Sequence, residues 1–159
     1  MLERVWKTIE GQEIVVADVL RDLLSFPQGK SVHIGTDSQQ AGRHTEFVTV
    51  LVVLTEGKGG RAFYCRERVT RIKSLRERLL KEVWSSVDTG LALNGMIPDG
   101  LELTVHIDAN PDLRFKSSNY IKELTSLVVS QGFKMLLKPD SWAASHTADH
   151  VVKHKVLGM

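Results

Sequence analysis

The sequence has a single cysteine, Cys65, which excludes an internal disulfide framework and a zinc cluster built on several thiolates. It also lacks any stretch near the ~18–20 apolar residues that span a bilayer, and its N-terminus has no long apolar signal-peptide core. Neither sign of charge dominates, because 21 basic and 19 acidic residues leave a formal charge of +2. That balance permits nucleic-acid binding without requiring it. These absences predict a cytoplasmic protein without a membrane partner.

What the sequence does contain is the composition of an ordinary globular domain. Of its 159 residues, 42% are hydrophobic and 25% are charged, values typical of a chain that buries a real core. We find no repeat, low-complexity tract or linker, so residues 1–159 are expected to form one domain.

Hydrophobic periodicity predicts alternating strands and helices along the chain. Helices are expected over residues 13–26, 74–93, from Ser117 or Ser118 to about 130, and from Asp140 or Ser141 to about 156. Strands are expected over residues 32–37, 46–54, 61–68, 103–108 and 133–137.

The lengths of the connections predict how these strands pair. Short links make the first three strands an antiparallel meander, whereas long helical connections make the fourth and fifth parallel to the first. The expected fold is therefore α/β: a mixed five-stranded sheet with flanking helices and an additional N-terminal helix.

Two of the predicted strands end on an aspartate, at Asp37 and at Asp108. Ligands of open α/β sheets bind beyond the carboxyl ends of the strands, so neighbouring strands would bring both acids to one rim. Like charges held that close are costly unless a proton or a cation relieves them. We therefore expect a metal site, although each aspartate also has a simpler interpretation as a turn residue.

Further acids are expected where helices pass that rim. Glu77 lies in the early turns of the helix after the meander, and it is preferred there over Glu82. The alternative for Glu77 is a surface acid paired with a lysine at helical spacing. Asp149 is the only acid inside the last predicted helix. Four such carboxylates suit Mg²⁺ or Mn²⁺, which take hard oxygen ligands.

Other polar residues are candidates for supporting roles. Lys116 and Lys138, near predicted helix starts, and Ser38 are candidates for contacting substrate, with plain surface lysines as the alternative. His146 and His150, one turn apart near Asp149, either support the metal ligands or shuttle protons without binding the metal, or belong to a partly exposed helix face.

Several unusual strings give the chain a recognisable resemblance. They are His33-Ile34-Gly35-Thr36-Asp37-Ser38-Gln39, Ser74-Leu75-Arg76-Glu77-Arg78-Leu79, His106-Ile107-Asp108, Lys116-Ser117-Ser118 and the segment from Lys138 to Ser145, followed by Ala148-Asp149. Over almost its whole length the chain resembles the YkuK-type family of predicted ribonuclease H-related nucleases. The resemblance implies a ribonuclease H-like fold and Asp37, Glu77, Asp108 and Asp149 as metal ligands.

Two functions fit these observations. The first is a nuclease that hydrolyses phosphodiester bonds by a two-metal-ion mechanism with an Asp-Glu-Asp-Asp cluster. The second is a non-catalytic nucleic-acid-binding module on the same fold. The sequence sign of such a module would be the loss of one or more of the four acids. RNA, DNA and hybrid substrates, endo- and exonuclease modes, and the oligomeric state are left open by the sequence.

Overall fold

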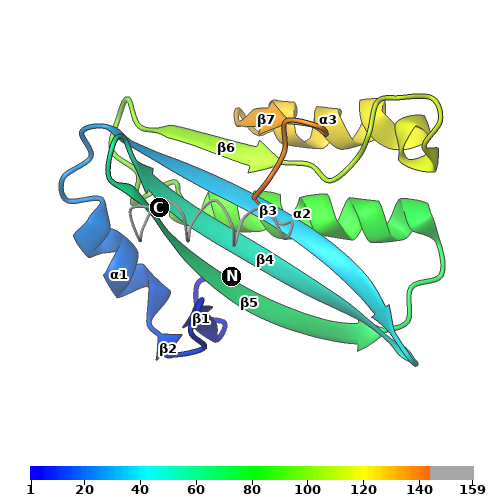
Figure 1. Cartoon of the computed structure of the whole chain (residues 1–159), viewed down its shortest axis with the longest axis horizontal. Coiled ribbons are helices and arrows are strands. Elements are labelled where there is room, and N and C mark those ends of the chain that lie inside the picture. Colours follow the sequence, from blue (N-terminus) through cyan, green and yellow to red (C-terminus); the bar gives the residue numbers. More distant parts are fainter. Residues whose placement is uncertain (144–159) are drawn as a thin grey trace.

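The computed structural model describes residues 1–143 and shows an α/β fold with a mixed sheet (Figure 1). Its elements are β1 (Trp6–Thr8), β2 (Glu13–Ile14), α1 (Val16–Leu23), β3 (Lys30–Ala41), β4 (His44–Thr55), β5 (Gly59–Thr70), α2 (Leu75–Leu93), β6 (Glu102–His106), the 3₁₀ helix η1 (Lys116–Tyr120), α3 (Ile121–Ser130) and β7 (Lys134–Leu136).

The long strands β3, β4 and β5 form the expected antiparallel meander, each of them 12 residues long. β6 pairs in parallel with β3, and β7 in parallel with β6. The order across the sheet is β2-β1-β5-β4-β3-β6-β7. The α/β class and the directions of the five predicted strands are thus confirmed.

The N-terminal region differs from the sequence prediction in two ways: the sheet has more than the five strands expected, and the helix expected over residues 13–26 is shorter. β1 and β2 form a small antiparallel hairpin that extends the sheet beyond β5, so the described residues form seven strands. The helix α1 is confined to Val16–Leu23. Strands of three and two residues are too short to give a periodic signal. What holds the hairpin is Trp6, which is completely buried.

Two other boundaries also differ. The helix expected from Ser117 or Ser118 begins with η1, and α3 starts only at Ile121; the Ser117 hydroxyl accepts a hydrogen bond from the Asn110 N–H instead of capping α3. The last helix was expected from Asp140 or Ser141, but residues 140–143 are not helical, and the remainder of that prediction lies outside the described residues.

The core lies on one face of the sheet. Buried side chains from α1, α2 and α3 join those of β3 to β6 in a single cluster, in which Leu20, Ile34, Leu51, Val87 and Leu124 are fully buried. α2 runs behind the meander along this face (Figure 1). The opposite face carries a smaller cluster around Val52 and Ala62, against which Trp142 packs. Within residues 1–143, none of the helices combines the length and apolar character needed to cross a lipid bilayer.

Candidate metal centre

Asp37 lies in the part of β3 that extends beyond its parallel neighbour β6. The pairing of β3 with β6 ends where Gly35 lies opposite His106, and β3 then continues along β4. Asp37 and Asp108 each lie two residues beyond that last pair. The parallel register therefore brings both acids to one level at the edge where β6 ends. Asp37 is thus an interior residue of β3 rather than its last residue, but the two aspartates meet as the sequence predicts.

The third carboxylate of this edge comes from α2. Oxygen atoms of Asp37, Glu82 and Asp108 all lie within 4.8 Å of one another. Glu82 is only 6% exposed, whereas the two aspartates are partly exposed. We call these three residues the acidic cluster. It joins a strand, a helix and a loop that are far apart in the sequence.

Glu77, the acid preferred from the sequence, lies outside the acidic cluster. Ser74 caps α2 by accepting a hydrogen bond from the Glu77 N–H at 3.3 Å, which places Glu77 in the exposed first turn. Glu82 is five residues further along and therefore about 140° around the helix. Its neighbours at helical spacing, Leu79 and Ser86, are buried. The burial of these neighbours, which only the packing of α2 against the sheet reveals, distinguishes Glu82 from Glu77.

Ser38 holds the carboxylate of Glu82 in place. The Ser38 hydroxyl donates to Glu82 Oε2 at 2.5 Å, and the Arg78 guanidinium donates to the same hydroxyl at 3.1 Å and to the Ser38 carbonyl at 3.3 Å. Ser38, a candidate for contacting substrate, is therefore a buried residue with its hydroxyl engaged by two neighbours. The sequence offers Arg78 only as one of several basic residues in this segment, because its contact with Ser38 depends on how the helix packs against the strand.

Replacing Ser38 by alanine is expected to lower the free energy of unfolding by about 1–3 kcal/mol, because a buried carboxyl group loses a hydrogen-bond partner. Urea denaturation at neutral pH measures the change. Ser126→Ala is the matched control, since Ser126 is exposed and donates to the carbonyl of Lys122 in its own helix. It should change stability by less than about 0.5 kcal/mol. An equally small change in Ser38→Ala would contradict this account of Glu82.

Burial and the neighbouring carboxylates raise the pKa values of Asp37 and Glu82. Burial raises the pKa of Asp37 to about 6, and the nearby Asp108 adds to that rise, while the Ser38 N–H and Lys138 oppose it. Burial also raises the pKa of Glu82 well above its usual range; the Ser38 hydroxyl opposes the rise, and Asp37 and Asp108 add to it. Crowded, partly dehydrated carboxylates are stabilised by a bound cation. An all-oxygen donor set of this kind fits Mg²⁺ or Mn²⁺.

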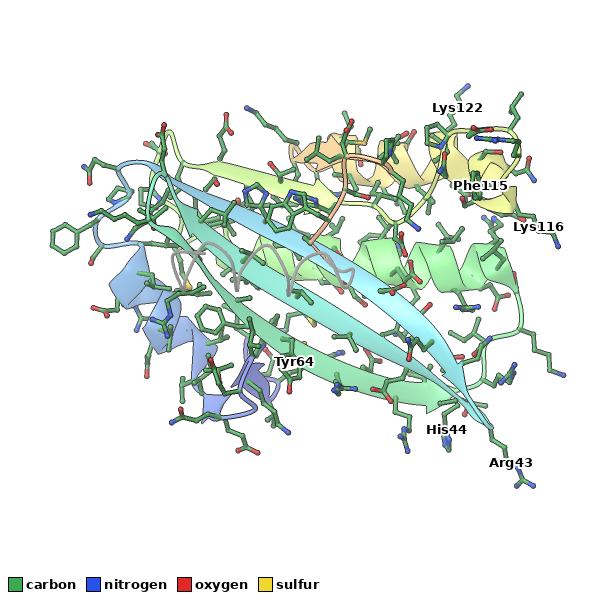
Figure 2. The ribbon with its side chains drawn as sticks, in the orientation of Figure 1. Arg43, His44, Tyr64, Phe115, Lys116 and Lys122 are labelled. Atoms are coloured by element: carbon green, nitrogen blue, oxygen red, sulfur yellow. The ribbon has the colours of Figure 1, made fainter. Side chains whose placement is uncertain are left out.

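The predicted lysines lie in different places. Lys138 is at the acidic cluster, where its Nζ lies 2.5 Å from Asp108 Oδ1. Lys116 begins η1, is exposed, and points outward from the molecule (Figure 2). Asp149, His146 and His150 lie outside the described residues.

Two histidines and a tryptophan tie the chain after β7 to the sheet at the end of β6. The Trp142 N–H donates to His106 Nδ1 at 3.1 Å, so His106 carries its proton on Nε2. That nitrogen lies 2.9 Å from His33 Nδ1 and therefore donates to it. Burial, with a smaller effect from His33, lowers the pKa of His106 to about 3, which keeps the ring neutral. The network therefore holds Trp142 against His106, the last residue of β6, which lies two positions before Asp108.

Comparison with known sequences identifies relatives over most of the chain. A family profile described as Ribonuclease H-like matches residues 15–153. The Uncharacterized protein YkuK of Bacillus subtilis (strain 168) is 29% identical over 159 residues, an alignment that covers 89% of this chain and 92% of that protein.

Comparison with solved structures finds ribonuclease H domains at low identity. LC11-RNase H1 in complex with RNA/DNA hybrid is 13% identical with a TM-score of 0.44, and the match covers 80% of this chain and 98% of that one. RNase H1 of the halophilic archaeon Halobacterium salinarum NRC-1 is 16% identical with a TM-score of 0.39, over 81% and 99% of the two chains. The N-terminal RNase H domain of Rv2228c from Mycobacterium tuberculosis was solved as a fusion with maltose binding protein. It is 12% identical with a TM-score of 0.39, and the match covers 80% of this chain and 94% of that one.

Proposed function

Because the chain belongs to the ribonuclease H-like family, we propose that it is a metal-dependent nuclease that hydrolyses phosphodiester bonds in nucleic acid. The observation that carries this proposal is the convergence of Asp37, Glu82 and Asp108 within 4.8 Å at the edge of the sheet. A binding module without catalysis has no need for a buried acid in such a cluster. The burial of Glu82 therefore favours the enzyme over the module.

Asp37, Glu82 and Asp108 are the residues proposed to hold Mg²⁺ or Mn²⁺. Asp149, outside the described residues, remains the proposed fourth ligand. When bound, two such ions supply an activated water and charge stabilisation for the leaving oxygen of a phosphodiester. The part played by this chain is to hold three carboxylates together at the edge of the sheet, one of them, Glu82, buried and two partly exposed. Ser38 orients Glu82 for that purpose.

Removal of divalent ions is expected to abolish cleavage completely. The test incubates the full chain with labelled single-stranded RNA, single-stranded DNA and RNA/DNA hybrid, in EDTA and after replacement of EDTA by Mn²⁺ or Mg²⁺. Cleavage of at least one substrate should occur only with the divalent ion. Equal cleavage in EDTA would contradict the metal mechanism. Binding of a substrate without cleavage under any of these conditions would favour the non-catalytic module.

A further inference from the structure

Lys138 brings a positive charge directly into the acidic cluster. Its Nζ lies 2.5 Å from Asp108 Oδ1, and within residues 1–143 no other ion pair involves Asp37, Glu82 or Asp108. The second cation nearby, Arg78, bonds to Ser38 instead of to a carboxylate. The ammonium of Lys138 therefore partly neutralises the cluster in the absence of a metal.

The backbone of Lys138 is held by hydrogen bonds, whereas its side chain is half-exposed. The Lys138 N–H donates to the carbonyl of Ala109 at 3.2 Å, next to Asp108. In the following turn, the N–H groups of Asp140 and Ser141 donate to the carbonyl of Leu137 at 2.8 and 2.9 Å. The side chain of Lys138 is 46% exposed, and its stem has four flexible carbons. The ammonium can thus leave Asp108 without any change in the fold.

An ammonium and a divalent ion cannot both lie against the same carboxylate oxygen without strong repulsion. A metal that binds Asp108 Oδ1 must therefore displace the Lys138 ammonium from that oxygen. We propose that Lys138 is an internal competitor for the metal, which occupies the acidic cluster when it is empty and is expelled to the rim when a divalent ion binds. This inference rests on the proposed metal site, and it assigns to Lys138 a role different from that of a simple substrate-binding lysine.

The direction in which the affinity for Mn²⁺ changes when Lys138 is replaced distinguishes this proposal from a structural role of Lys138. Lys138→Met removes the ammonium and keeps an unbranched apolar stem of similar shape, so Mn²⁺ should bind more tightly, by about tenfold given the partial exposure of the pair. A lysine that merely holds the Asp108 loop in place would give the opposite result. In that case the same substitution would disorder a ligand and weaken binding.

Isothermal titration of the metal-free full chain with Mn²⁺ measures this difference. Lys138→Arg keeps the positive charge and should stay close to the wild-type affinity. Lys134→Met is the matched control, because Lys134 forms a comparable pair with Glu102 at 2.5 Å, at the opposite end of the parallel strands. It should leave the affinity for Mn²⁺ unchanged. Unchanged or weaker binding by Lys138→Met would overturn the inference while leaving the metal site intact.

Absence of Mn²⁺ binding by the wild type and by Lys138→Met alike would instead overturn the metal site, and the inference with it. A second measurement on the wild type does not depend on the folding of Lys138→Met. The side-chain ammonium signal of Lys138, identified in ¹H–¹⁵N spectra by its loss in Lys138→Arg, should move or vanish when Mg²⁺ is added. The Lys134 signal should stay. A Lys138 signal that persists unchanged at saturating Mg²⁺ would refute displacement.

Discussion

Replacement of Glu82 by glutamine is expected to reduce metal-dependent cleavage by at least about 10³-fold, which corresponds to about 4 kcal/mol of activation free energy. Replacement of Glu77 by glutamine should leave the rate within about twofold. Both acids lie on α2, but only Glu82 is buried beside Asp37 and Asp108. The glutamine at position 82 can still accept the hydrogen bond from Ser38, so the fold should be retained while one metal ligand loses its charge.

The two variants are controls for each other, because each removes one negative charge from the same helix by the same chemical change. Initial rates with saturating Mn²⁺ measure the effect, and circular dichroism confirms that both proteins are folded. If the loss of activity followed Glu77 instead, the exposed first turn of α2 would be the catalytic position. The assignment of the acidic cluster would then be wrong.

Asp37→Asn is expected to make the metal-free protein more stable at pH 7 and at the same time to remove the stabilisation by Mn²⁺. Burial and the proximity of Asp108 raise the pKa of Asp37 from 3.8 to about 6. A carboxyl group with a raised pKa stabilises the fold below about pH 4, and that contribution is lost as the pH rises through 6. At pH 7 the ionised Asp37 therefore opposes folding, by on the order of 2 kcal/mol.

Asparagine removes the charge and retains the local contacts, since its side-chain oxygen can accept from the Ser38 N–H as Asp37 does at 2.9 Å. In EDTA at pH 7 the midpoint of thermal unfolding should rise by about 4–8 °C. At pH 4 the wild type and the variant should differ little. Mn²⁺ should raise the midpoint of the wild type by mass action and leave that of the variant nearly unchanged. A variant less stable than the wild type in EDTA at pH 7 would show that the cluster is not a site of electrostatic strain.

Long, regular segments of this fold were predictable because their patterns have many repeats. The meander of β3, β4 and β5 and the helix α2 are examples, and Ser74 is found at the N-cap of α2 where that helix was expected to begin. The hairpin of β1 and β2 could not be predicted in this way. Its strands have two or three residues, and its stability comes from tertiary contacts of Trp6 that no local pattern records.

The candidate site was predictable in one part and not in another. Strand direction alone was sufficient to bring Asp37 and Asp108 together, because parallel strands in register bring equivalent positions to one edge. The choice between Glu77 and Glu82 required knowledge of how α2 is rotated against the sheet. That rotation is set by packing of residues such as Val83 and Val87, and the helical pattern alone allowed an acid on either side of the apolar face.

The central claim is that three carboxylates distant in the sequence form one metal site. A crystal grown without metal and then soaked in Mn²⁺ tests it most directly, through the anomalous signal of manganese. We predict a peak bounded by carboxylate oxygens of Asp37, Glu82 and Asp108, with the ammonium of Lys138 moved away from Asp108. A soaked crystal with no anomalous peak at these residues, and with Lys138 still paired to Asp108, would contradict the account.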